Sequence, residues 1–152
     1  MAAQLWLLRH GEAEPHAADD DSRDLTPRGE DQARAAGRAA AALDLVFHGV
    51  YTSPKVRARR TAELACEALG VEPVIHPPLR DGFAVSDARE LLLAGEDQRI
   101  LVVGHNPDLA QVVYDLTGAR VDFKKGALAG VRDRDLIALL RPRELAAIAA
   151  SV

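Results

Sequence analysis

Four basic or imidazole side chains stand at, or shortly after, the ends of three predicted strands. Arg9 and His10 follow "LWLL", Arg57 follows the "YTSP" segment, and His105 follows "ILVVG". Two guanidinium groups and two imidazoles gathered in one place would repel one another unless they bound an anion. Phosphate suits them best, because a planar guanidinium binds its oxygens through paired hydrogen bonds. We therefore expect a phosphate site built from these four side chains.

Two neighbouring residues are further candidates for phosphate binding. Gly11 leaves the backbone free to turn sharply and lets phosphate come close. Asn106 stands at the start of a predicted helix, where backbone donors and the helix dipole favour an anion. Taken singly, Arg9 and Arg57 could be exposed arginines, and His10 and His105 satisfied core histidines. The shared position of these four at the ends of strands favours the functional interpretation, whereas for Gly11 an ordinary turn glycine stays equally open.

Strand and helix signals alternate along the chain, which indicates the fold class. Hydrophobic spacing and turn residues predict helices and strands in alternation. The expected helices cover Pro27–Leu43, 57–70, 106–118 and 143–152; the expected strands cover Gln4–Arg9, 45–53, 72–76, 100–105 and a pair within 126–142. This order favours a three-layer α/β/α sandwich with a mostly parallel sheet and an antiparallel edge. Ligands of such sheets bind outside the carboxyl ends of the strands, where the four side chains stand.

Several residues mark the expected helix ends. Thr26 is a good N-cap with Pro27 at the first helical position, and Asn106 with Pro107 repeats the pattern later in the chain. Gly118 is expected to end the later helix.

Composition narrows the class of protein. The 152 residues are 48% hydrophobic with a formal net charge of −4, which suits one domain over residues 1–152 and disfavours a surface made for nucleic acid or acidic membranes. The single cysteine, Cys66, excludes a disulfide framework and a multi-cysteine metal site. Neither a signal sequence nor a membrane span is recognisable, so we expect a cytoplasmic protein. The oligomeric state stays open.

The segments "LLRHGEAE", "SPKVRARRTAE" and "VVGHNPDL", in this order, resemble the histidine phosphatase superfamily. Its members share an Arg-His-Gly signature, a second arginine after a Ser-Pro turn and a second histidine late in the chain. The intervening "SRDLTPRGEDQARAAG" and the small size are most similar to the SixA-type phosphohistidine phosphatase branch. The resemblance implies a phosphoglycerate mutase-like fold and a hydrolase of signal transduction that acts on phosphohistidine in a partner protein.

The resemblance also implies a mechanism. His10 would attack phosphorus and form a phosphohistidine intermediate that water hydrolyses, while Arg9, Arg57 and His105 stabilise the phosphoryl oxygens. This chemistry requires no cofactor and no metal. The acidic run 19–21 near His16 lacks a convincing ligand spacing.

The proton donor for the leaving group is the weakest part of the match. An alcohol phosphate needs a general acid, for which Asp81 and Glu12 are the candidates. Without one, a phosphohistidine substrate is favoured, because a departing imidazole is far less basic than an alkoxide. Two alternatives stay open: a phosphatase of small phosphate monoesters, and a phosphate-binding regulatory module without turnover. Arg59 and Arg60 are expected either to face solvent or to contact an acidic partner.

Overall fold

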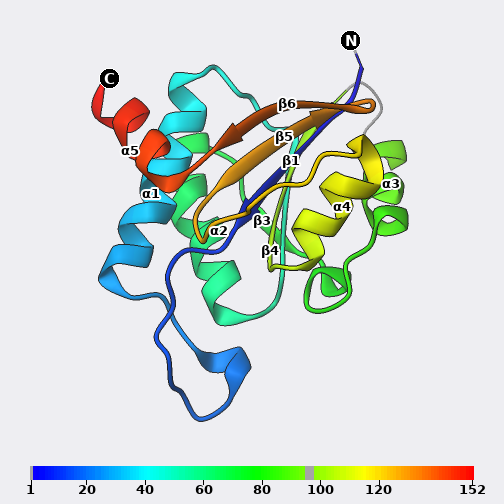
Figure 1. The fold of residues 1–152 in the computed structure, drawn as a ribbon. Coiled ribbons are helices and arrows are strands. Elements are labelled where there is room, and N and C mark those ends of the chain that lie inside the picture. The colour runs from blue at the N-terminus through cyan, green and yellow to red at the C-terminus, as the bar shows by residue number, and fades with distance from the viewer. Residues whose placement is uncertain (1, 95–97) are drawn as a thin grey trace.

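The computed structural model describes residues 2–94 and 98–152, which form a six-stranded sheet with helices on both faces (Figure 1). The strand order is β3-β2-β4-β1-β5-β6; β3, β2, β4 and β1 run parallel, and β5 and β6 complete an antiparallel edge. The strands are β1 (Gln4–Arg9), β2 (Gly49–Thr52), β3 (Pro73–Ile75), β4 (Arg99–Gly104), β5 (Leu128–Arg132) and β6 (Asp135–Leu140).

In the described residues, five α-helices and two short 3-10 turns accompany the strands. Helices α1, α2 and α5 lie on one side of the sheet and α3 and α4 on the other (Figure 1). This confirms the predicted three-layer α/β/α sandwich. The helices are α1 (Pro27–Ala42), α2 (Val56–Leu69), α3 (Val85–Ala94), α4 (Asp108–Thr117) and α5 (Pro142–Ala150), and the turns are η1 (Asp20–Ser22) and η2 (Pro77–Leu79).

The two central strands carry the core. β1 and β4 are adjacent, and their apolar side chains alternate between two clusters, one against α1, α2 and α5 and one against α3 and α4. Trp6 and Leu8 belong to the first cluster, and Leu5 and Leu7 to the second. A strand buried on both faces reads as a continuous apolar run, which is why "LWLL" and "ILVV" do not alternate.

Most predicted element ends are confirmed. Thr26 caps α1 by accepting from the Gly29 N–H, and Gly118 ends α4 in the left-handed conformation. The tail forms the expected strand pair around Asp133 and Arg134.

Two features of the prediction need correction. Helix α4 begins at Asp108 with Pro107 as its N-cap, so Asn106 and Pro107 are not the cap and first residue of this helix. The Asn106 side chain still contacts the first turn of this helix, because its Oδ1 accepts from the Ala110 N–H at 3.4 Å, and its amide nitrogen donates to the Phe123 carbonyl at 3.2 Å. Helix α3 was not predicted at all.

Within the described ranges, no helix has the length and apolar character needed to cross a membrane.

Candidate active site

The carboxyl ends of β1, β2 and β4 meet at one rim of the sheet. The His10 N–H donates to the Gly104 carbonyl at 3.1 Å, and the Ser53 N–H donates to the Val103 carbonyl at 3.0 Å, so the residues that follow the three strands are held side by side. The imidazole rings of His10 and His105 lie with centroids 5.3 Å apart at 55°. The sequence-predicted pair of histidines therefore forms one site.

His10 is buried and has a fixed tautomer. The residue is 6% exposed, and Nδ1 lies 2.7 Å from the Gly11 carbonyl oxygen. A carbonyl only accepts, so Nδ1 carries the proton and Nε2 keeps its lone pair. Burial lowers the pKa of His10 to about 3; the hydrogen bond to the Gly11 carbonyl opposes this shift, and the positive charges of Arg57 and Arg9 add to it. The ring is consequently neutral near pH 7, as a nucleophile must be.

His105 is held through its Nε2 atom, whereas His10 is held through its Nδ1 atom. Its Nε2 lies 2.8 Å from Ser53 Oγ, while its Nδ1 is buried without a hydrogen-bond partner among the described residues. Burial lowers the pKa of His105 to about 4, followed in effect by the charges of Arg57 and Lys55. The ring of His105 is therefore neutral near pH 7.

The two arginines are partly held by the protein and partly free. Arg57 donates to the Asp20 carbonyl at 2.7 Å and to the Asp20 carboxylate at 3.0 Å, and Arg9 donates to the Phe123 carbonyl at 2.8 Å. The guanidinium of Arg57 holds the pKa of Asp20 at about 2. The Nε atoms of both arginines are buried and have no partner among the described residues. Buried donors of this kind normally have partners, and the phosphate site that the sequence predicts at these side chains would supply them.

Gly11 and Thr61 tie the signature segment to the helices. The Gly11 N–H donates to Thr61 Oγ1 at 3.1 Å, and that hydroxyl donates to the Arg57 carbonyl at 2.7 Å. A side chain at Gly11 would place its Cβ 2.6 Å from the Gly29 carbonyl oxygen. Gly11 thus permits a close approach to α1 and orients His10 through its own carbonyl. Direct contact of Gly11 or Asn106 with phosphate stays a prediction.

The two general-acid candidates are both engaged with other groups. Asp81 is exposed and lies 3.1 Å from Lys55 Nζ and 2.9 Å from Arg80 Nη1; the hydrogen bond from Lys55 lowers its pKa most. Glu12 accepts from Thr26 Oγ1 at 2.7 Å at the start of α1. A general acid must hold a proton, which the surroundings of Asp81 disfavour.

The acidic run at η1 is paired with cations at the rim of the site. Lys55 Nζ lies 3.6 Å from Asp20 and 3.9 Å from Asp21, and Arg80 also pairs with Asp21. No cluster of three or more His, Cys, Asp or Glu side chains suited to a metal ion occurs in residues 2–94 and 98–152.

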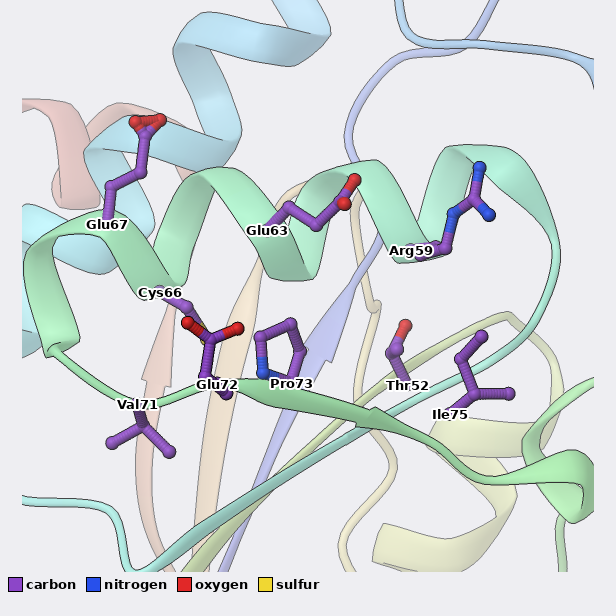
Figure 2. A pocket seen from close by; sticks show the side chains of 9 residues that line it. All are labelled: Thr52, Arg59, Glu63, Cys66, Glu67, Val71, Glu72, Pro73 and Ile75. Atoms are coloured by element: carbon purple, nitrogen blue, oxygen red, sulfur yellow. The ribbon is translucent and has the colours of Figure 1, made fainter.

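A separate cavity of about 480 Å³ lies between α2 and β3 (Figure 2). Its lining includes Glu63, Glu67 and Glu72 with Arg59 as the single cation, so it does not suit a phosphate. Arg59 is exposed, whereas Arg60 pairs with Glu30 of α1 at 3.4 Å.

Sequence reasoning missed several groups that hold the site together. Ser53, Asp20 and the Phe123 carbonyl each bind one of the four predicted side chains. Ser53 had a sequence signal, since it is the last residue of a predicted strand. Asp20 lies in η1 and Phe123 in the segment before β5, and the sequence shows no spacing that would connect them with Arg57 or Arg9.

Comparisons with known proteins show the family and the fold to which this chain is similar. The model of the histidine phosphatase superfamily (branch 1) matches residues 5–88. A phosphohistidine phosphatase SixA homologue of Haemophilus influenzae is 30% identical over 76% of this chain and 78% of its own. An uncharacterised protein of Picosynechococcus is 32% identical over 93% of this chain and 98% of its own. A solved structure of the protein histidine phosphatase SixA with tungstate superposes with a TM-score of 0.85 and 25% identity over 93% of this chain and 99% of its own.

The chain therefore belongs to the histidine phosphatase superfamily, and its similarity to the SixA proteins places it with the SixA-type branch. The chain also matches probable phosphoglycerate mutases, of which it spans about half the length or less.

Proposed function

We propose that this chain hydrolyses phosphohistidine on a partner protein through a covalent phosphoryl intermediate on His10. The observation that carries the proposal is the group of buried atoms around His10 that lack partners among the described residues: Nε of Arg9, Nε of Arg57 and Nδ1 of His105. Such donors suit a tetrahedral oxyanion, and tungstate, named with a solved SixA relative, is one.

The first step transfers the phosphoryl group to the enzyme. The lone pair of His10 Nε2 forms a bond to phosphorus while the bond from phosphorus to the substrate imidazole breaks. The substrate ring, protonated on its other nitrogen, takes the electron pair and leaves as neutral imidazole. Arg9 and Arg57 bind the non-bridging oxygens. When Ser53 donates to Nε2 of His105, Nδ1 of that ring carries a proton and donates to the same oxygens. The second step forms a bond from water oxygen to phosphorus and breaks the bond to Nε2, which releases inorganic phosphate.

The surroundings of Asp81 support phosphohistidine over an alcohol phosphate. Its lowered pKa leaves it ionised near pH 7, so it does not supply the proton that an alkoxide leaving group requires. The ion pairs of Asp20 and Asp21 with Arg57, Lys55 and Arg80 support a metal-independent reaction, because these carboxylates already have cationic partners. A buried, unpaired Cys66 fits the proposed cytoplasmic location.

The test compares a phosphohistidine peptide with p-nitrophenyl phosphate for wild type, His10→Ala and Asp81→Asn. We expect His10→Ala to lose about 1,000-fold or more in kcat/KM for the peptide, and Asp81→Asn to stay within about 2-fold. Wild type should carry an acid-labile, base-stable phosphoryl label that His10→Ala lacks.

Three results would contradict the proposal in different ways. A large Asp81→Asn defect confined to the ester would assign the chain to small phosphate monoesters. Tight phosphate binding without turnover would make it a binding module. Full activity of His10→Ala would exclude His10 as the nucleophile.

A further inference from the structure

A basic cavity adjoins the active site on the side of Arg9. It has a volume of about 530 Å³, within the range of binding pockets, and is formed where the start of α1, the segment before β5 and the start of α5 meet. Six of its nine lining residues are cationic: Arg9, Arg28, Lys124, Lys125, Arg141 and Arg143. The cavity is thus strongly positive in a chain of net charge −4.

The protein neutralises this charge only in part. Lys124 pairs with Asp122 at 3.0 Å and Arg141 with Glu144 at 2.7 Å. Both Lys125 and Arg143 are exposed and form no ion pair with any residue in the described ranges. Glu12, the carboxylate in the lining, already accepts from Thr26 and lies 3.9 Å from Arg28. The cavity therefore has an excess of positive charge available to a partner.

Arg9 belongs both to the lining of the cavity and to the proposed phosphate site. Its guanidinium is held by the Phe123 carbonyl. The Gly126 N–H donates to the carbonyls of Arg9 and His10 at 3.1 and 3.0 Å, which fixes the segment carrying Lys124 and Lys125 against the end of β1. A macromolecule whose phosphoryl group reaches His10 consequently lays its neighbouring surface over this cavity.

We infer that the basic cavity binds Asp and Glu side chains of the phosphoprotein that lie beside its phosphohistidine, so that the enzyme selects substrates with acidic surroundings. This inference rests on the proposed function. Complementary charge at such a position speeds encounter and suppresses wrongly charged partners. It also orients the partner, since the cavity lies on one side of His10.

The test uses two phosphohistidine peptides that differ only in flanking Glu and Asp against Gln and Asn. Wild type is compared with Lys125→Glu/Arg143→Glu. The matched control, Arg132→Glu/Arg134→Glu, makes the same change in net charge at the opposite end of the sheet, because Arg132 pairs with Gln4 at the start of β1. All four positions are exposed, so thermal unfolding should change little.

We expect wild type and the control to favour the acidic peptide by about 10-fold in kcat/KM at low salt, with the preference shrinking as salt is added. The cavity variant should lose this preference while it keeps its rate on the neutral peptide. The inference is overturned by a wild type that hydrolyses both peptides equally, by a cavity variant that retains the preference, or by a control that loses it equally. Failure of wild type to hydrolyse either peptide would instead overturn the proposed function.

Discussion

In each of the two site histidines, His10 and His105, one ring nitrogen has a hydrogen-bond partner among the described residues and the other has none. The Gly11 carbonyl fixes Nδ1 of His10, and Ser53 fixes Nε2 of His105. Both rings are neutral near pH 7 because burial lowers their pKa values to about 3 and about 4. Under the proposed function, His10 is the neutral nucleophile and His105 the hydrogen-bond donor that the reaction requires.

The contact from Ser53 to His105 predicts a positioning role. Ser53→Ala removes the hydroxyl from Nε2, so the ring of His105 loses the bond that orients its Nδ1. We expect kcat to fall about 10-fold with KM nearly unchanged, as the loss of one hydrogen bond in the transition state implies. Steady-state kinetics on a phosphohistidine peptide measure this. Ser53→Thr keeps a hydroxyl and should recover much of the rate; equal loss in both variants would count against positioning.

The pairing of Arg57 with Asp20 predicts a change in anion affinity. Asp20→Asn keeps an oxygen that can accept from Arg57 but removes a negative charge beside the bound phosphoryl group. We expect inorganic phosphate to inhibit about 3-fold more tightly at low salt, and the difference to shrink as salt is added. Asp19→Asn is the control, because Asp19 caps η1 and makes no contact with Arg57 among the described residues. An equal effect of Asp19→Asn would point to net charge alone.

The residues of the proposed reaction could be predicted from the sequence more readily than the residues that hold them. His10, Arg57 and His105 each follow a strand, and the sheet brings strand ends together whatever the loops do. Asp20 reaches Arg57 across 37 positions of the chain, and the Phe123 carbonyl reaches Arg9 across 114. Contacts of that separation depend on loop paths that no local pattern specifies.

At the scale of elements, α1 and α2 pack closely enough to exclude a side chain between them. A Cβ at Gly37 would lie 2.2 Å from the Ala65 carbonyl oxygen, and a backbone atom cannot move aside as a flexible side chain can. The alanines of both helices, Ala36 and Ala40 with Ala58 and Ala62, continue this close contact in the same core cluster. The alanine enrichment of the sequence therefore has a packing role in addition to helix propensity.

This packing predicts that Gly37→Ala is destabilising despite the better helix propensity of alanine. We expect the free energy of unfolding to fall by about 2 kcal/mol, because overpacking outweighs the gain in propensity. Urea unfolding measures the change. Arg38→Ala, at an exposed neighbouring position of α1, should stay within about 0.5 kcal/mol. A Gly37→Ala protein as stable as wild type would mean that the helices separate freely.

The elements that prediction missed are those with few buried residues. α3 buries only Ala88 among its ten described residues, and Leu93 is 81% exposed, so its sequence carries little apolar periodicity. The start of α4 was misplaced for a different reason. Asparagine is a residue type that is common at N-caps. The amide nitrogen of Asn106, however, donates to the distant Phe123 carbonyl, a tertiary contact that the local pattern does not show.

At the scale of the whole molecule, strand order is what joins the two histidines. β1 and β4 are neighbours at the centre of the sheet although about ninety residues separate them in the chain. The same arrangement buries both rings, and their burial couples the chemistry of the site to the stability of the fold. An unfolded chain exposes both imidazoles to water, where each takes up a proton near its ordinary pKa of about 6.5.

This coupling predicts that stability falls as the pH falls below about 6.5, well before most carboxylates are protonated. The folded pKa values of His10 and His105, about 3 and about 4, lie below the unfolded value, so the unfolded chain binds more protons. Each ring therefore contributes a slope of up to about 1.4 kcal/mol per pH unit, lost as pH decreases. Urea unfolding from about pH 7 to about pH 5 measures this slope. His10→Asn should reduce it by roughly half; an unchanged slope would mean that His10 is already free to take up a proton in the folded protein.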